Sequence, residues 1–103
     1  MADPMRIRAQ QKGDAVEVRV LMAHVMETGT RRDGSGQVVP AHFIQTITAT
    51  HNGKTVLTAS FGPAVSQNPV LNFSFKGGNK GDKVIVTWVD NRGERRTDEA
   101  TIS

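Results

Sequence analysis

Apolar and polar residues alternate with a period of two through most of this chain, and this pattern constrains the fold more than any other feature. In VEVRVLM the apolar residues Val16, Val18, Val20 and Met22 fall at every second position. Such spacing is typical of a β-strand that buries one face. No stretch keeps the 3.6-residue period of an amphipathic helix. The sequence therefore predicts an all-β protein.

Turn signals divide the alternating stretches into separate strands. Asn52-Gly53 is the strongest of them, because a type I′ hairpin turn needs positive φ at both central residues. The expected strands number about seven in ~100 residues, which is typical of an immunoglobulin-like antiparallel β-sandwich. We expect a single domain over residues 1–103, with a small barrel as the alternative architecture. The expected strands cover residues 5–9, 16–22, 43–50, 55–61, 70–76, 83–89 and 96–102.

A long connection, HVMETGTRRDGSGQVVPAHF, spans residues 24–43 between two of these strands. Loops longer than about 12–15 residues are uncommon in compact domains and are usually functional or disordered. Glycines at positions 29, 34 and 36, together with Pro40, shape its course. The sequence leaves two interpretations open, a partner-facing element or a mobile solvated loop.

The outer face of one predicted sheet carries few charges. In an immunoglobulin-like order, the third, fourth, sixth and seventh strands form one sheet. If Phe43, Ile47, Ala49 and Leu57 point inward, the outward side chains are mostly Thr, Ile and Val. Interface cores are depleted in charge, which favours burial against a partner, although threonine is also common on exposed strands. The opposite sheet presents Arg6, Arg8, Glu17 and Arg19, which we expect to be solvated.

The residues give no support for catalysis. The chain has no cysteine, which excludes a disulfide, a thiolate metal site and a cysteine nucleophile. No serine lies in a nucleophile elbow, and KGGNKG lacks the strand–loop–helix context of a phosphate-binding loop. His24, His42 and His51 do not have the spacing of a known metal site, and we expect them on the surface or in turns. His42 and His51 should also face opposite ways unless a bulge intervenes. We predict no catalytic, cofactor-binding or metal-binding residues.

Charge and composition exclude other partners. A formal charge of +3 is mild, and four Phe and one Trp are too few for a base-stacking platform, so we expect no nucleic acid. No segment is long and apolar enough to span a membrane. The first residues, MADPMRIRAQ, lack the apolar region of a signal peptide. These features alone would place the protein in the cytoplasm.

Three segments resemble one family in order and spacing. They are HVMETGTRRD, PAHFIQTITATHNGKTVL and NPVLNFSFKGGNKGDKVIVTWVDNRGERRTDEATI. Together they are similar to the SoxZ family, and the resemblance runs from about Gly13 to Ile102. One departure is Val25, where the family pattern has proline, so a rigid residue is missing from the start of the loop.

The resemblance implies a non-catalytic subunit of a carrier complex in thiosulfate oxidation. It implies a heterodimer with SoxY, whose C-terminal Gly-Gly-Cys-Gly-Gly tail carries the sulfur intermediates, and transient contacts with other Sox enzymes. It also implies a periplasmic location, reached by export together with a SoxY that carries the twin-arginine signal. This replaces the cytoplasmic expectation.

The predicted partner-binding residues come from the uncharged face and the long connection. Arg31 and Arg32 would meet acidic surfaces of visiting enzymes or anionic sulfur adducts. A generic immunoglobulin-like binding or accessory module is the alternative function, and it would need no SoxY. The full predicted set is Ile44, Thr46, Val56, Ile85, Thr87, Val89, His24, Glu27, Arg31 and Arg32.

Overall fold

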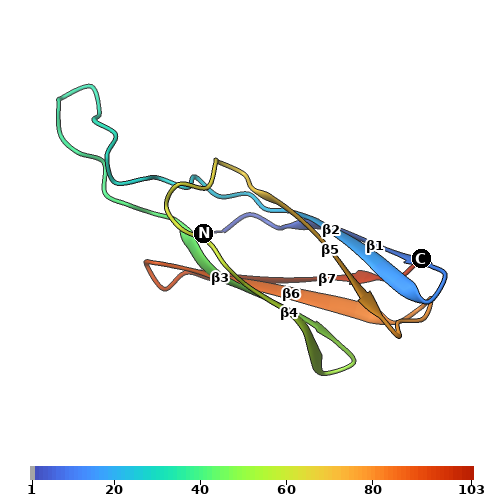
Figure 1. The fold of residues 1–103 in the computed structure, drawn as a ribbon. Coiled ribbons are helices and arrows are strands. Elements are labelled where there is room, and N and C mark those ends of the chain that lie inside the picture. Colours follow the sequence, from blue (N-terminus) through green and yellow to red (C-terminus); the bar gives the residue numbers. More distant parts are fainter. Residues whose placement is uncertain (1) are drawn as a thin grey trace.

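The computed structural model describes residues 2–103 and contains seven β-strands (Figure 1). Each expected strand is present, with ends shifted by at most a few residues. The strands are β1 (Arg6–Lys12), β2 (Ala15–Leu21), β3 (Ile44–His51), β4 (Lys54–Ser60), β5 (Val70–Lys76), β6 (Lys83–Asp90) and β7 (Arg95–Thr101).

The strands form two antiparallel sheets that face each other, so the predicted β-sandwich is confirmed (Figure 1). One sheet has three strands in the order β1-β2-β5, and the other has four in the order β4-β3-β6-β7. The third, fourth, sixth and seventh strands therefore share one sheet, as their sequence order predicts. Their outer face points away from the three-stranded sheet.

The core lies between the sheets and uses the residues that the alternation places inward. Val16, Val20 and Trp88 are fully buried. Full burial of an aliphatic or aromatic side chain of this kind contributes about 1.5–3 kcal/mol. The two central strands, β2 and β6, thus account for much of the core, and their outward residues remain available for other contacts.

Two register shifts, one in β3 and one in β4, overturn part of the predicted outer face. One lies between Ile44 and Thr46, where β3 pairs with β6. Simple alternation placed Ile44 outward, but its side chain is fully buried. The other shift adds a residue to β4, because Ala49 pairs with Leu57 and Thr50 with Thr55, which leaves Val56 as the extra residue. Val56 is half-buried and packs against the core. Because a bulge adds a residue to one strand, it reverses which residues face inward. Ile44 and Val56 are corrections to the predicted interface.

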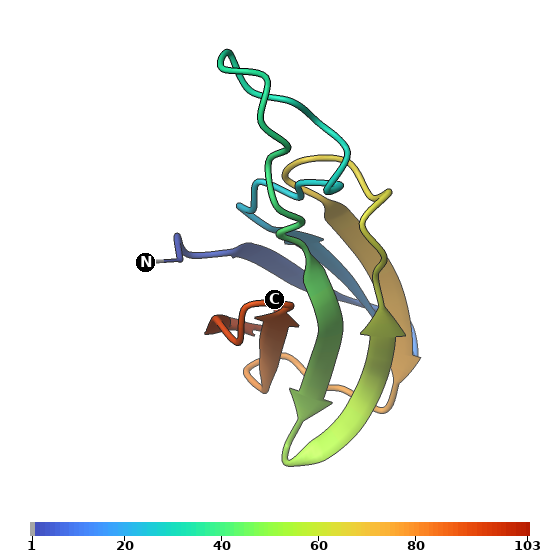
Figure 2. The same cartoon turned by 90° about the vertical axis from the view of Figure 1, so that its left-hand side faces the viewer.

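Residues 24–43 form a narrow ribbon that projects from one end of the sandwich (Figure 2). Isolated antiparallel bridges join Glu27 to His42 and Arg32 to Val38. At the tip, Asp33 accepts hydrogen bonds from the backbone N–H groups of Ser35 (2.9 Å) and Gln37 (3.1 Å). The connection is therefore a hydrogen-bonded arm, and it contributes to a molecular length of 53 Å against widths of 20 and 19 Å.

Candidate functional site

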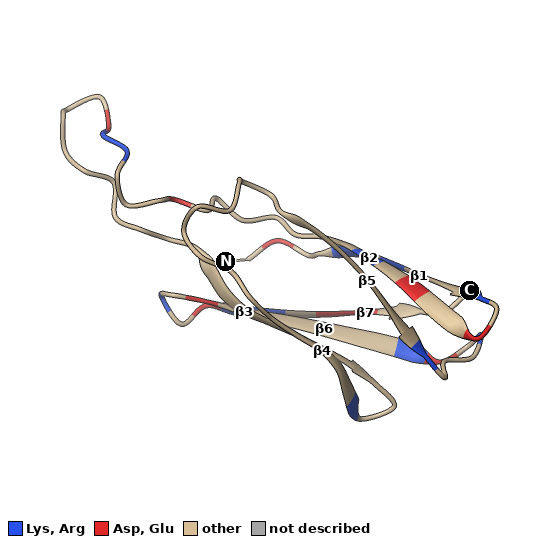
Figure 3. Cartoon of the chain, in the orientation of Figure 1, with Lys and Arg blue, Asp and Glu red and all other residues tan. Residues whose placement is uncertain are grey.

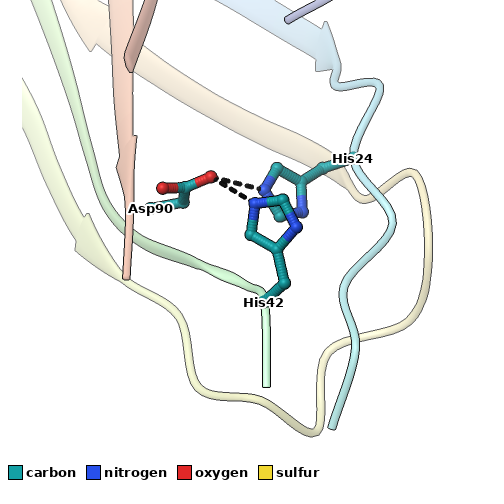
Figure 4. Close-up of side chains that lie close together, drawn as sticks. All are labelled: His24, His42 and Asp90. Carbon is teal, nitrogen blue, oxygen red and sulfur yellow. Dashed lines mark hydrogen bonds and ion pairs between the residues drawn. The ribbon is translucent and has the colours of Figure 1, made fainter. Parts of the chain in front are cut away.

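A buried cluster of three polar side chains lies where the arm leaves the sandwich (Figure 4). His24 follows β2, His42 precedes β3, and Asp90 ends β6. The Nε2 atoms of His24 and His42 lie 3.0 Å and 2.7 Å from the same oxygen, Oδ2 of Asp90. The side chains of His24 and Asp90 are 3% and 0% exposed, and that of His42 is 20% exposed. The cluster thus joins both ends of the arm to β6.

The second oxygen of Asp90 organises the turn between β6 and β7. Oδ1 accepts the backbone N–H groups of Arg92 and Glu94, each at 2.9 Å. Burial of Asp90 raises its pKa, but the hydrogen bonds from the two histidines and the two backbone groups outweigh this effect and hold the pKa below its ordinary value. Asp90 is therefore a buried carboxylate anion with four donors.

The protonation of His24 follows from its second ring nitrogen. Nδ1 accepts the backbone N–H of Met26 at 3.1 Å, so this nitrogen carries no proton. A carboxylate can only accept, so the ring proton of His24 lies on Nε2 and is donated to Asp90. His24 is thus a neutral donor in this arrangement.

This tautomer decides what the cluster can bind. His24, His42 and Asp90 are the one group in residues 2–103 whose ligand atoms lie close enough together to hold a metal ion. A metal needs the Nε2 lone pair, which would move the proton of His24 to Nδ1, where it would oppose the Met26 N–H. The observed hydrogen bonds therefore favour a structural anchor over a metal centre.

Further contacts fix His24 in place. Asn68 forms hydrogen bonds with both backbone groups of His24. Its side-chain oxygen accepts the His24 N–H at 3.0 Å, and its backbone N–H donates to the His24 carbonyl at 2.9 Å. The ring stands edge-on to Trp88, with ring centroids 5.1 Å apart. The start of the arm is thus held by both sheets.

The expectation of surface or turn histidines is wrong for His24. His51 is also paired, because its Nε2 lies 2.8 Å from Oδ2 of Asp82, and its ring packs against Phe75 of the other sheet. His42 contacts the buried Asp90 and His51 packs against Phe75 of the other sheet, so both face the interior instead of facing opposite ways. The single extra residue of β3, at Gln45, interrupts the alternation between them. An Asp at the end of β6 was the available signal for the cluster, but sequence spacing does not reveal which histidines it meets.

The uncharged outer face of the four-stranded sheet is present, although smaller than predicted. Register pairs Thr46 with Val89 and Thr50 with Ile85 across β3 and β6. Thr46 is exposed, Ile85 is 38% exposed, and Val89 is half-buried. In Figure 3, β3 and β6 are tan over most of their length, which shows how few charges lie along the middle of this sheet. Thr87, the remaining predicted residue of this face, is half-buried and shares a 2.9 Å hydroxyl contact with Thr97 of β7.

The charged residues predicted for the arm are engaged within the arm itself. Arg31 forms a two-pronged ion pair with Glu27, with contacts from 2.7 to 3.2 Å. This pair raises the pKa of Arg31 and lowers that of Glu27. Arg32 donates from Nη1 to the carbonyl of Gly36 at 2.8 Å. Of the two arginines, Arg32 is the one whose charge is not matched by a carboxylate in these contacts.

Comparison with protein families identifies the relationship. The family described as "Sulphur oxidation protein SoxZ" matches residues 5–101, nearly the whole chain. The chain belongs to the SoxZ family. Membership of this family assigns it a role in sulfur oxidation and confirms the resemblance drawn from the three sequence segments. A search of curated proteins gave no significant match.

Solved structures share the fold at low sequence identity. Hypothetical protein PH1083 from Pyrococcus horikoshii OT3 is 20% identical, with a TM-score of 0.67 over 99% of this chain and 89% of that one. A superoxide reductase in the oxidized state is 17% identical, with a TM-score of 0.64 and the same coverage. A superoxide reductase (neelaredoxin) from Ignicoccus hospitalis is 16% identical, with a TM-score of 0.57 over 99% and 82%. These likenesses show the fold alone.

In residues 2–103 no helix has the length and apolar character needed to cross a membrane.

Proposed function

We propose that this SoxZ-family chain is the non-catalytic subunit of a SoxYZ carrier and that it binds SoxY through the outer face of the four-stranded sheet. The observation that carries the proposal is the uncharged Thr, Ile and Val surface over β3 and β6. The sulfur intermediates would then be carried by the cysteine of SoxY, and this chain would provide the body on which that subunit is held.

The chemistry of the chain supports a carrier role. It has no cysteine to which sulfur could be attached. The cluster of His24, His42 and Asp90 is an anchor, because both histidine N–H groups and two backbone N–H groups are bound to Asp90. The cluster offers no hydroxyl or thiol nucleophile, and its hydrogen bonds join both ends of the arm to β6, which is why we assign it to shaping the arm.

The outer face has the composition of an interface core. Ile85 keeps 38% of its surface exposed at the middle of the sheet, and its cross-strand neighbour on β3 is Thr50. The charges near it lie on β7 and at the start of β6, where Lys83 and Glu99 pair at 3.2 Å. Glu99 lies directly opposite Ile85 on β7, so the uncharged strip over β3 and β6 is bordered by charges, as the core of a protein interface is bordered by a polar rim.

The proposal also covers the role of the arm and the compartment in which the complex acts. The arm projects away from the sandwich at the end opposite the β1–β2 turn, so it can touch a third protein while the sheet face is covered (Figures 1 and 2). We assign transient contacts with other Sox enzymes to it, with Arg32 as the charge available for acidic surfaces. The complex would act in the periplasm, and this chain would be exported together with SoxY.

Titration of the purified chain with its cognate SoxY tests the proposal. Calorimetry should give one-to-one binding, and size-exclusion chromatography should show a heterodimer in place of two monomers. Incubation with thiosulfate and an oxidant should add sulfur mass to SoxY and none to this chain, once methionine oxidation is excluded. A chain that stays monomeric beside SoxY would support the generic binding module instead.

A further inference from the structure

The outer face of the three-stranded sheet carries three arginines without a carboxylate partner. Arg6 and Arg8 lie on β1 and Arg19 lies on β2, and all three are exposed. None of them takes part in an ion pair within residues 2–103, whereas the nearby Glu17 pairs with Lys12 at 3.0 Å.

Two of these arginines face each other directly. The register pairs Arg8 with Arg19, and residues opposite each other in an antiparallel ladder have Cα atoms about 4.5–5.5 Å apart. Like charges at directly opposite positions destabilise a sheet. The isolated chain therefore bears a repulsion that an anionic group placed between the two guanidinium groups would remove.

The surface around the arginines is hollowed and partly apolar. Arg8 and Arg19 line two adjacent hollows on this face. One is also lined by Glu17 and reaches Ser74 of β5, whereas the other reaches Arg6 and Leu21 and has no carboxylate in its lining. Leu21 is paired in register with Val70, and these side chains are 39% and 47% exposed. The second hollow, lined by Arg6, Arg8 and Arg19, is thus cationic and lies beside an apolar ledge formed by Leu21 and Val70.

We propose that this face docks an acidic polypeptide segment of a protein partner, with carboxylates on Arg6, Arg8 and Arg19 and an apolar side chain on the ledge. The planar guanidinium group matches a carboxylate with two parallel hydrogen bonds. The ledge favours a polypeptide over a small inorganic anion, which has nothing to place on Leu21 and Val70. A nucleic acid is disfavoured because no aromatic residue lies outward on this sheet for a base to stack on.

The proposal does not rest on the binding of SoxY. The two outer faces lie on opposite sides of the sandwich, so an acidic partner and SoxY can be held at the same time. The arginine face would be a second docking surface on the carrier. It is charged, whereas the first surface is uncharged.

The test uses the full chain and a defined probe, the peptide Glu-Glu-Leu-Glu-Glu-Leu with blocked ends. At low ionic strength, amide chemical shifts should change at Arg6, Arg8, Arg19, Leu21 and Val70, and added salt should weaken binding. The peptide with Gln in place of Glu should bind at least about tenfold more weakly. Sodium sulfate and an oligothymidylate, at matched ionic strength, distinguish a small-anion or nucleic-acid site.

Two variants and a charge-matched control complete the experiment. Arg8→Glu/Arg19→Glu and the uncharged Arg8→Gln/Arg19→Gln should each weaken peptide binding at least about tenfold while keeping the fold, since both side chains point outward. Lys54→Glu/Lys80→Glu changes the net charge as much as the first variant and should leave binding unchanged within about twofold. Any of four results would overturn the proposal. They are chemical-shift changes elsewhere on the chain, an equal loss of peptide affinity in the lysine control, no peptide binding, or tighter binding of sulfate or oligothymidylate than of the peptide.

Discussion

Replacing Asp90 with asparagine tests the anchor at the base of the arm. The side chain is 0% exposed and accepts four hydrogen bonds. An asparagine keeps its oxygen for the backbone N–H groups of Arg92 and Glu94, but its amide NH₂ then faces His24 and His42. His42 can shift its proton to Nδ1 and accept from this amide. His24 cannot do so, because Met26 already donates to its Nδ1.

The loss of folding free energy in Asp90→Asn can be estimated from these contacts. A hydrogen bond to a charged group contributes about 1.5–3 kcal/mol, and leaving a buried donor unsatisfied costs about 1–3 kcal/mol. Asp90→Asn loses the charge and leaves the His24 donor unpaired, so we expect a destabilisation of roughly 2–4 kcal/mol. For a domain of this size, that lowers the Tm by roughly 10–20 °C.

Chemical and thermal unfolding followed by circular dichroism measure this effect. The control is Asp82→Asn, which removes the same charge from a histidine pair whose aspartate is 26% exposed. The control should destabilise the protein clearly less than the Asp90 variant, because Asp82 is only partly buried and water screens its charge more than that of the fully buried Asp90. Equal losses in the two variants, or no loss at Asp90, would refute the account of a buried anion with four donors.

Further predictions concern pH, packing and the arm. Folding holds the pKa of Asp90 below its ordinary value of 3.8. The stability that its charge provides is therefore complete above that value and is lost as pH falls through the lower folded pKa. Below about pH 4, the free energy of unfolding should thus fall less steeply with pH for Asp90→Asn than for wild type. Gly78→Ala places a Cβ 2.5 Å from Cγ2 of Val16 and should cost about 1–3 kcal/mol in denaturant titrations, whereas Gly34→Ala meets open space and should cost far less. Arg31→Ala/Arg32→Ala should leave the Tm and SoxY binding nearly unchanged but slow turnover of the reconstituted thiosulfate-oxidising system at low salt; superimposable salt curves would make these arginines ordinary solvated charges.

The sequence predicts the fold well because alternation and strand order carry most of the information. Val16, Val84 and Trp88 are buried as their positions predict, and the four strands assigned to one sheet do share it. What alternation cannot predict is where it is interrupted. Ile44 and Val56 were misplaced because a bulge at Gln45 of β3 and a bulge at Val56 of β4 each shift the register by one residue, and no Gly or Pro marks either bulge in the sequence.

The anchor at the base of the arm was missed for a different reason. His24, His42 and Asp90 are brought together only by the packing of three chain segments, and their separation in sequence carries no signal. The arm itself was predicted as a long connection, but its ribbon form depends on hydrogen bonds such as that from Val39 N–H to the Arg31 carbonyl, at 2.7 Å. The assignment of the uncharged face to SoxY stays a prediction.

The most direct test of that assignment is the affinity of SoxY for the Ile85→Asp variant, measured by titration calorimetry. The account predicts weakening by about 2–4 kcal/mol, which is roughly 30-fold to 1,000-fold in Kd, because the substitution places a charge in a desolvated interface. The matched control Val70→Asp introduces the same charge on the opposite sheet, at a valine that is 47% exposed against 38% for Ile85, and should pair with SoxY like wild type. Normal pairing by the Ile85 variant, with both variants folded, would contradict the central claim that SoxY binds this face.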